Sequence, residues 1–187
     1  MARIYYLLLF TLLPWAAYPA NEWFPIGAKM TSMGYTSVTY VDLWSVHNNQ
    51  AAMAFCNQAA IGAYFENRFM IRELGYQAAA IVLPTRYGSI GANVLFNGDQ
   101  NMNQLMAGFC YARKFGEKFS AGIQVDYMQT FLAEGYGLHQ ALTFEGGILA
   151  KINKELSFGA HIFNPVSARL ATYNDERIPT EMNAGFN

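Results

Sequence analysis

Residues 119–130 read FSAGIQVDYMQT, and from Phe119 to Tyr127 every second residue is apolar or aromatic. The residues between them, such as Gln124 and Asp126, are small or polar. An α-helix would repeat its apolar residues at intervals of three and four, which this stretch does not. The period of two therefore predicts an extended strand with one apolar face and one polar face.

Long strands of the same kind surround this stretch. The alternation runs through residues 104–115, 118–132 and 138–152, which are 12 to 15 residues long. Strands in globular proteins usually contain about 5 to 6 residues, whereas a tilted strand needs roughly 9 to 11 residues to cross a bilayer. These strands are therefore long enough to span a membrane.

The connections between the predicted strands differ in length. Residues 116–117 and 153–155 form short polar turns, whereas residues 133–137 and 164–179 form longer loops. Short turns at one rim and longer loops at the other are typical of outer-membrane barrels. We therefore predict an all-β fold, an antiparallel transmembrane up-and-down β-barrel of the bacterial outer membrane, with about seven to eight strands in this chain.

The last residues, 180–187, read as the opening of a further strand. They lack the long closing strand with a terminal aromatic residue that a completed barrel would show. We expect the chain to be the N-terminal portion of a larger barrel. An eight-stranded barrel whose lumen is filled by its own side chains is the alternative.

The composition agrees with apolar residues that alternate with polar ones and do not form long continuous runs. Apolar residues make up 53% of the 187 residues and charged residues 13%, against about 25% charged residues in ordinary soluble domains. The mean hydropathy is only +0.09. The net charge of −1, without a basic cluster, gives no basis for a nucleic-acid partner.

Three parts follow from the sequence. Residues 1–20 resemble a secretory leader, because Arg3 precedes an apolar centre at residues 4–13 and alanines stand near the expected cut. The apolar centre is short of the roughly 20 residues of a spanning helix, although a membrane anchor is the alternative. Residues 21–58 form a periplasmic or hatch-like segment, and residues 59–187 form the barrel wall.

If the apolar rows contact lipid, the polar rows between them point to the interior. Charged side chains are costly in hydrocarbon and tolerated in a wet or hydrogen-bonded lumen. Two interpretations remain open: a polar lining that selects a solute, and a salt-bridged filling that holds the strands in register. The predicted interior residues are Glu66, Arg68, Gln124, Asp126, Glu145, Lys151 and His161.

No motif in the sequence indicates catalysis, a metal site or a cofactor. Histidine, cysteine and carboxylate residues do not occur at ligand spacings such as C-x-x-C or H-x-x-x-H. We therefore predict that the protein is not an enzyme. Cys56 and Cys110 either form a bridge that pins the 21–58 segment inside the wall or remain two separate thiols.

A set of motifs runs from about residue 27 to the end of the chain. They are Gly27-Ala28, Met33-Gly34, Ser37-Val38, Asp42, Trp44-Ser45 and Asn48-Asn49-Gln50-Ala51, followed by residues 115–127, 159–165 and 176–180. These motifs resemble the PorV and PorQ group of outer-membrane proteins, which are relatives of FadL-type channels. Members of that group usually carry Asn-Pro-Ala in the first region, whereas this sequence has Gln50 in place of the proline.

The resemblance implies both a position and a role. In FadL-type proteins the N-terminal segment is an internal hatch, which implies a similar position here for Asp42, Trp44, Asn48 and Asn49. Alternatively, these side chains only cap turns of an ordered entry segment. The group takes part in type IX protein secretion and surface attachment, so the implied partners are outer-membrane lipid and secretion-system proteins or their cargo. A FadL-like channel for hydrophobic solutes such as long-chain fatty acids is the alternative function.

Overall fold

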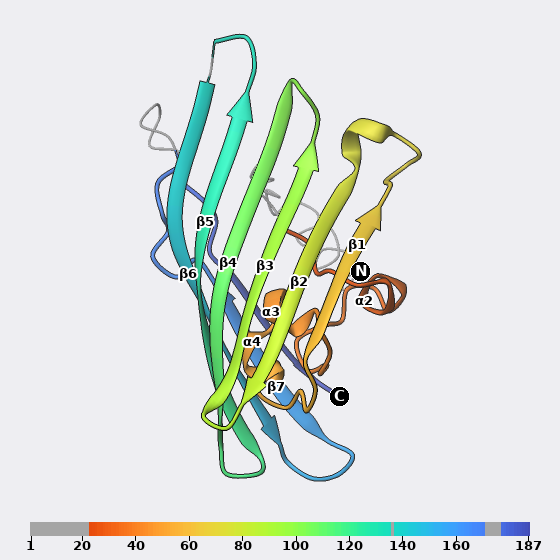
Figure 1. Cartoon of the computed structure of the whole chain (residues 1–187), viewed down its shortest axis with the longest axis vertical. Coiled ribbons are helices and arrows are strands. Elements are labelled where there is room, and N and C mark those ends of the chain that lie inside the picture. Colours follow the sequence, from red (N-terminus) through yellow and green to blue (C-terminus); the bar gives the residue numbers. More distant parts are fainter. Residues whose placement is uncertain (1–22, 136, 171–176) are drawn as a thin grey trace, which may run out of the picture.

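A computed structural model of the chain describes residues 23–135, 137–170 and 177–187. Their strands form one antiparallel sheet of eight strands, in which each strand lies beside the next one along the chain (Figure 1). The predicted all-β, up-and-down architecture is therefore confirmed. The sheet is curved but not closed. Among the described strands, β1 pairs only with β2 and β8 pairs only with β7, so the two edge strands do not meet. The predicted leader, residues 1–20, lies outside the described residues.

The long strands predicted from the sequence correspond to β4, β5 and β6, with boundaries that differ by two residues or fewer. No helix in the described ranges is long and apolar enough to cross a membrane. The strands are β1 (Ala60–Glu66), β2 (Tyr76–Thr85), β3 (Gly88–Gly98), β4 (Met102–Phe115), β5 (Phe119–Leu132), β6 (Gly137–Lys151), β7 (Ser157–Phe163) and β8 (Glu181–Phe186). The helices are α2 (Ala28–Ser32), α3 (Ser45–Asn48), α4 (Gln50–Met53) and the short 3-10 helix η1 (Arg72–Leu74).

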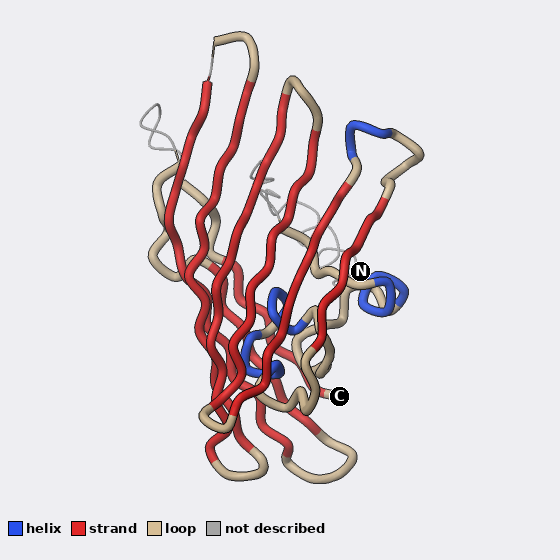
Figure 2. Tube along the Cα trace, in the orientation of Figure 1, coloured by secondary structure: helices blue, strands red, loops and turns tan. Residues whose placement is uncertain are grey.

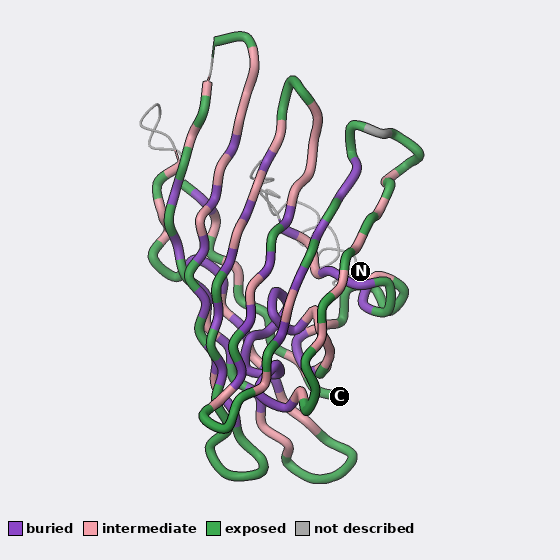
Figure 3. The backbone as a smooth tube through the Cα atoms, viewed as in Figure 1, coloured by how far each residue is buried: buried purple, intermediate pink, exposed green. Residues whose placement is uncertain are grey.

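The two faces of the sheet differ as the alternation predicts. In β5, Gln124 and Asp126 are buried, while the exposed fractions of Ile123 and Val125 are 65% and 58%. The same alternation of buried and exposed residues runs along the other long strands (Figure 3). The outer face consequently presents a broad apolar surface. Its most exposed members include Ile61, Phe65, Phe109, Ile123, Leu142 and Met182.

The N-terminal segment, residues 23–58, packs against the inner face of the sheet (Figure 2). Helix α4 contacts β4, β5 and β6, and α3 contacts β2 and β3. Leu149 belongs to the inward-facing row of β6, where it packs with Ala51, Ala52 and Phe55 of the segment. The core of the molecule thus lies between the segment and the sheet.

Inward-facing glycines allow the segment to come this close. A Cβ atom at Gly122 would lie 2.6 Å from the carbonyl carbon of Gln50, and one at Gly159 would lie 2.5 Å from the carbonyl oxygen of Val38. At Gly91 the nearest atom would be the Met53 sulfur, at 2.6 Å. Distances below about 3 Å are not tolerated without movement of the neighbouring atoms. Because the segment occupies the space beside these positions, they accept only glycine without such movement.

Gly122→Ala should lower the free energy of unfolding by about 1–3 kcal/mol, because the added methyl group meets backbone atoms of α4. Gly146→Ala, on the neighbouring strand, is the matched control, since its nearest neighbouring atom would be 3.7 Å away. Urea unfolding of the protein refolded in detergent measures both effects. Equal stability of the two variants would show that the segment does not pack against β5 as described.

Candidate functional site

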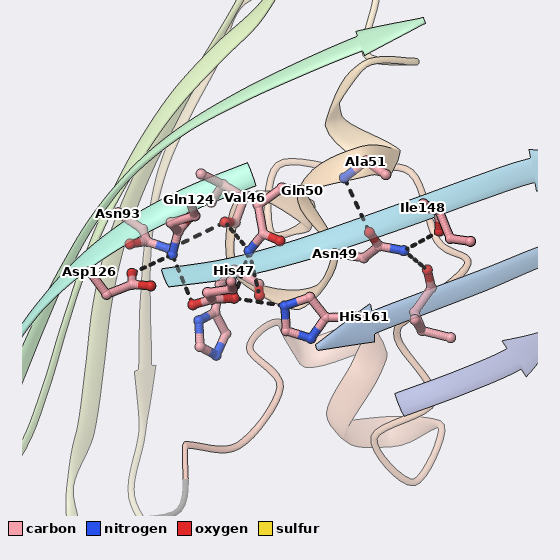
Figure 4. Close-up of polar contacts among 12 residues, drawn as sticks. Val46, His47, Asn49, Gln50, Ala51, Asn93, Gln124, Asp126, Ile148 and His161 are labelled. Carbon is pink, nitrogen blue, oxygen red and sulfur yellow. Dashed lines mark hydrogen bonds and ion pairs between the residues drawn. The ribbon is translucent and has the colours of Figure 1, made fainter. Parts of the chain in front are cut away.

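A buried polar cluster joins the N-terminal segment to the sheet (Figure 4). We call it the Glu145 cluster, and it consists of Gln50, Gln124, Asp126, Glu145 and His161. Gln50 comes from α4, Gln124 and Asp126 from β5, Glu145 from β6 and His161 from β7. Each of these residues is less than a tenth exposed. Four elements of the fold therefore meet at one group of polar side chains.

The carboxylate of Glu145 is the centre of the cluster. Its Oε2 accepts a hydrogen bond from Nε2 of Gln50 at 2.8 Å and lies 2.7 Å from Nε2 of His161. Its Oε1 accepts from Nε2 of Gln124 at 3.1 Å, and the same amide donates to Oδ1 of Asp126 at 2.7 Å. A buried carboxylate is tolerated when several donors surround it, which is the arrangement here.

The strand register explains why these side chains meet. Gln124 pairs directly with Glu145, and Gly147 pairs with His161, which places His161 two positions from Glu145 across the β6–β7 ladder. Residues two apart on a strand share a face, so all of these side chains project to the interior. The predicted inward orientation of Gln124, Asp126, Glu145 and His161 agrees with their burial.

The other predicted interior residues lie apart from the Glu145 cluster. Glu66 and Arg68 are half-buried and form their own ion pair at 3.0 Å. The Arg68 guanidinium also lies over the rings of Phe24 and Tyr76. Lys151 is half-buried, with its ammonium group 3.9 Å from the centre of the Phe55 ring. The interior charges are thus paired or packed on aromatic rings.

Two of the predicted hatch residues cap turns. Asp42 Oδ1 accepts a hydrogen bond from the Ser45 amide at 3.1 Å, and Ser45 Oγ accepts from the Asp42 amide at 3.0 Å. Asn49 caps α4 by accepting from the Ala51 amide at 3.1 Å. Its side-chain nitrogen donates to the carbonyl of Ile148 in β6 at 3.2 Å, so this residue also attaches the segment to the wall.

The remaining two hatch residues hold the segment together and against the wall. Asn48 accepts from the Ile26 amide and donates to the Ile26 carbonyl, both at 3.0 Å. Trp44 packs edge-on against Tyr64 of β1, with ring centres 5.8 Å apart. All four residues predicted from the resemblance therefore lie in the segment that packs against the sheet.

Sequence reasoning missed the side chain through which α4 reaches Glu145. Gln50 stands out in the sequence only as the residue that replaces the proline usual in the PorV and PorQ group. In the structure it is fully buried and donates to Glu145. Proline could not make this bond, so the departure from the family pattern is itself the signal that could have identified the residue.

His47 is a second residue that the sequence did not single out. It lies buried in α3, and its Nε2 donates to the carbonyl oxygen of Phe24 at 3.3 Å. Burial, helped by the neighbouring His161, lowers the pKa of His47 to about 4. The imidazole is consequently neutral at pH 7, and its Nδ1 is buried without a hydrogen-bond partner.

A cavity of about 740 Å³ lies beside the cluster, between the N-terminal segment and the β7–β8 edge of the sheet. Its walls combine Trp23, Phe24 and Phe163 with the two histidines His47 and His161. Within the described ranges no group of three or more histidine, cysteine or carboxylate side chains could hold a metal ion. The arrangement therefore offers a ligand aromatic surfaces and hydrogen-bonding groups.

The cysteines are two separate free thiols. Cys56 Sγ lies 3.6 Å from the carbonyl oxygen of Asp42, and Cys110 Sγ lies 3.7 Å from the sulfur of Met53. Of the two alternatives that the sequence left open, the structure shows the unbridged one. Packing and hydrogen bonds, without a covalent link, hold the segment in place.

Comparison of the chain with protein-family models, curated proteins and solved structures gives no match. The resemblance to the PorV and PorQ group therefore rests on the motifs quoted above.

Glu145→Leu should destabilise the fold by about 3–5 kcal/mol, because it leaves Gln50, Gln124 and His161 buried without their shared acceptor. Glu117→Leu, in the exposed β4–β5 turn, should change stability by less than about 0.5 kcal/mol. Both values come from urea unfolding in detergent. If Glu145→Leu lost no more unfolding free energy than the turn variant, the hydrogen bonds of Glu145 would not be what stabilises the interior.

The contribution of His47 to stability should fall as pH decreases from about 6.5 to about 4. His47 has a lower pKa in the folded protein than in the unfolded chain, so the unfolded chain binds more protons in this window. The expected loss from this residue is on the order of 3 kcal/mol. His47→Gln should reduce the slope of unfolding free energy against pH, whereas His139→Gln, at the far end of β6, should keep it. An unchanged slope in His47→Gln would contradict the lowered pKa of His47 in the folded protein.

Proposed function

We propose that this chain forms the wall of a bacterial outer-membrane β-barrel whose interior is occupied by its own N-terminal segment. The apolar outer face carries the proposal: Ile61 is 80% exposed, Leu142 69% and Met182 78%. Soluble monomers rarely expose apolar patches larger than a few hundred Å². Lipid is the environment in which such a face is stable, and strands of 14 and 15 residues such as β5 and β6 have the length required.

Within that setting we propose a PorV/PorQ-like role in type IX protein secretion and surface attachment. Support comes from the motifs of residues 27–51 and from the interior, where Gln50 and Asn49 bind the segment to β6. A segment fixed in this way suits a protein that presents a stable surface to secretion partners or cargo. An open aqueous pore would require that segment to leave.

One observation favours a second candidate, a FadL-like channel for hydrophobic solutes. The cavity beside the segment is large enough for a small organic molecule, and Trp23, Phe24 and Phe163 give it apolar walls. Opposing this candidate, Glu145 and His161 also line the cavity and are polar. A fatty acid chain gains nothing from these groups, so secretion remains the first proposal.

Deletion of the gene in its own bacterium separates the two functions. The secretion role predicts that cargo proteins accumulate in the periplasm and that the tagged protein copurifies with secretion-system components. The channel role predicts normal secretion and slower uptake of a radiolabelled fatty acid such as oleate. Normal secretion in the deletion strain would refute the first proposal.

Ile123→Lys should reduce insertion into lipid vesicles, because it places a charge on the outer face near the middle of β5. The expected cost is about 2–4 kcal/mol if this position lies near the bilayer midplane. Glu117→Lys, in the exposed β4–β5 turn, is the matched control and should insert normally. Urea titration of vesicle-bound protein measures the difference, and equal insertion of the two variants would argue against a lipid-facing outer row.

A further inference from the structure

The cavity beside the Glu145 cluster has walls with a specific pattern of hydrogen-bonding groups. His161 lines it, and Nε2 of this ring lies 2.7 Å from the Glu145 carboxylate. With Nε2–H donating to the carboxylate, Nδ1 keeps its lone pair and can only accept. The hydrogen bond described for this ring is the one that Nε2 forms.

His47, which belongs to the N-terminal segment, repeats the same arrangement. Its Nε2–H must donate to the carbonyl oxygen of Phe24, because a carbonyl only accepts. Its Nδ1 is therefore also an acceptor. The residue is only 7% exposed, and among the described residues this nitrogen has no hydrogen-bond partner. A buried polar group without a partner costs free energy unless a ligand or water satisfies it. His47 and His161 thus line one cavity, and each ring keeps one nitrogen as an acceptor.

The charge of the wall excludes an anionic ligand. Glu145 and Glu181 are among the residues that line the cavity, whereas none of its described lining residues is a lysine or arginine. A carboxylate or phosphate group would enter this space without a cationic partner and would be repelled by the existing carboxylates. A fatty acid headgroup is consequently a poor fit.

A cationic ligand is also disfavoured. The Glu145 carboxylate already accepts hydrogen bonds from Gln50, Gln124 and His161, which occupy three of its roughly four acceptor positions. An ammonium group would lose its water on entry and find neutral imidazoles in exchange. Neutral hydroxyl groups suit such acceptors better, because they donate one hydrogen bond each at a smaller cost of dehydration.

The rest of the wall supplies flat aromatic surfaces and short polar side chains. Trp23, Phe24 and Tyr35 line the cavity together with Ser37 and Asn183. Rings that carry hydroxyl groups at their edges and C–H groups on their faces match both kinds of surface. The volume of about 740 Å³ falls in the range that encloses small organic ligands.

We propose that this cavity binds a neutral, hydroxyl-rich ring compound of the saccharide class, of about one or two sugar rings, with His47 and His161 accepting hydrogen bonds from its hydroxyl groups. This site goes beyond the proposed secretion role, which does not require it. A ligand here would contact the segment and the sheet together, so its binding would also stabilise their association.

The test uses the full chain in detergent micelles, with imidazole signals observed by NMR. The chain has three histidines, and His139 lies outside the cavity, so its signal is an internal reference. Maltose, lactose, sucrose and trehalose are the probes, with laurate as the anionic and spermidine as the cationic comparison. We expect at least one disaccharide to shift the His47 and His161 signals saturably and to leave His139 unchanged.

Two variants of β8 make the test specific. Asn183 lines the cavity and pairs with His161, while its neighbour Met182 is 78% exposed on the other face. Asn183→Trp should fill the space and weaken binding at least about tenfold, whereas Met182→Trp should stay within about twofold of the unmodified protein.

Three outcomes would overturn the proposal. The first is that none of the four disaccharides shifts the His47 and His161 signals. The second is that laurate or spermidine binds and no disaccharide does. The third is that the disaccharide binds equally well to Asn183→Trp, which would place its site elsewhere. The secretion proposal would survive each of these results, since it rests on the motifs of residues 27–51 and on the bonds of Gln50 and Asn49 to β6.

Discussion

The interior of this protein depends on one buried carboxylate. Glu145 accepts hydrogen bonds from α4 and β5 and contacts β7, so a single side chain holds the N-terminal segment and three strands in one arrangement. Burying that charge is costly, and the surrounding amide and imidazole donors offset the cost only when all are in place. The position of the segment and the register of β5 to β7 are therefore mutually dependent.

The outer and inner faces follow different physical rules. Outside, any apolar side chain of suitable size satisfies the requirement, and Ile123, Val125 and Leu142 need no particular partner. Inside, each residue must match a neighbour: Gly122 leaves room for α4, and Gln124 bridges two carboxyl groups. The outer face consequently determines the environment of the protein, while the inner face determines its shape and any ligand.

The alternation of residues 119–130 was sufficient to predict the strands and their orientation, because a period of two fixes which side chains share a face. The alternation in β5 and β6 puts Gln124, Asp126 and Glu145 in the row opposite the apolar one, and all three are buried. It could not show that Gln50 meets Glu145, since that contact joins residues 95 positions apart and depends on how α4 sits in the curved sheet. Closure of the sheet is likewise a long-range property that no local pattern encodes.

The distance along the chain between the N-terminal segment and the strands that it contacts also affects the order in which these parts fold. Residues of the N-terminal segment leave the ribosome first, yet their binding surface consists of β4, β5 and β6, which are synthesised later. Contacts between distant parts of a chain form slowly because a long loop must first be closed. The segment must therefore remain unpaired until the strands that receive it have formed.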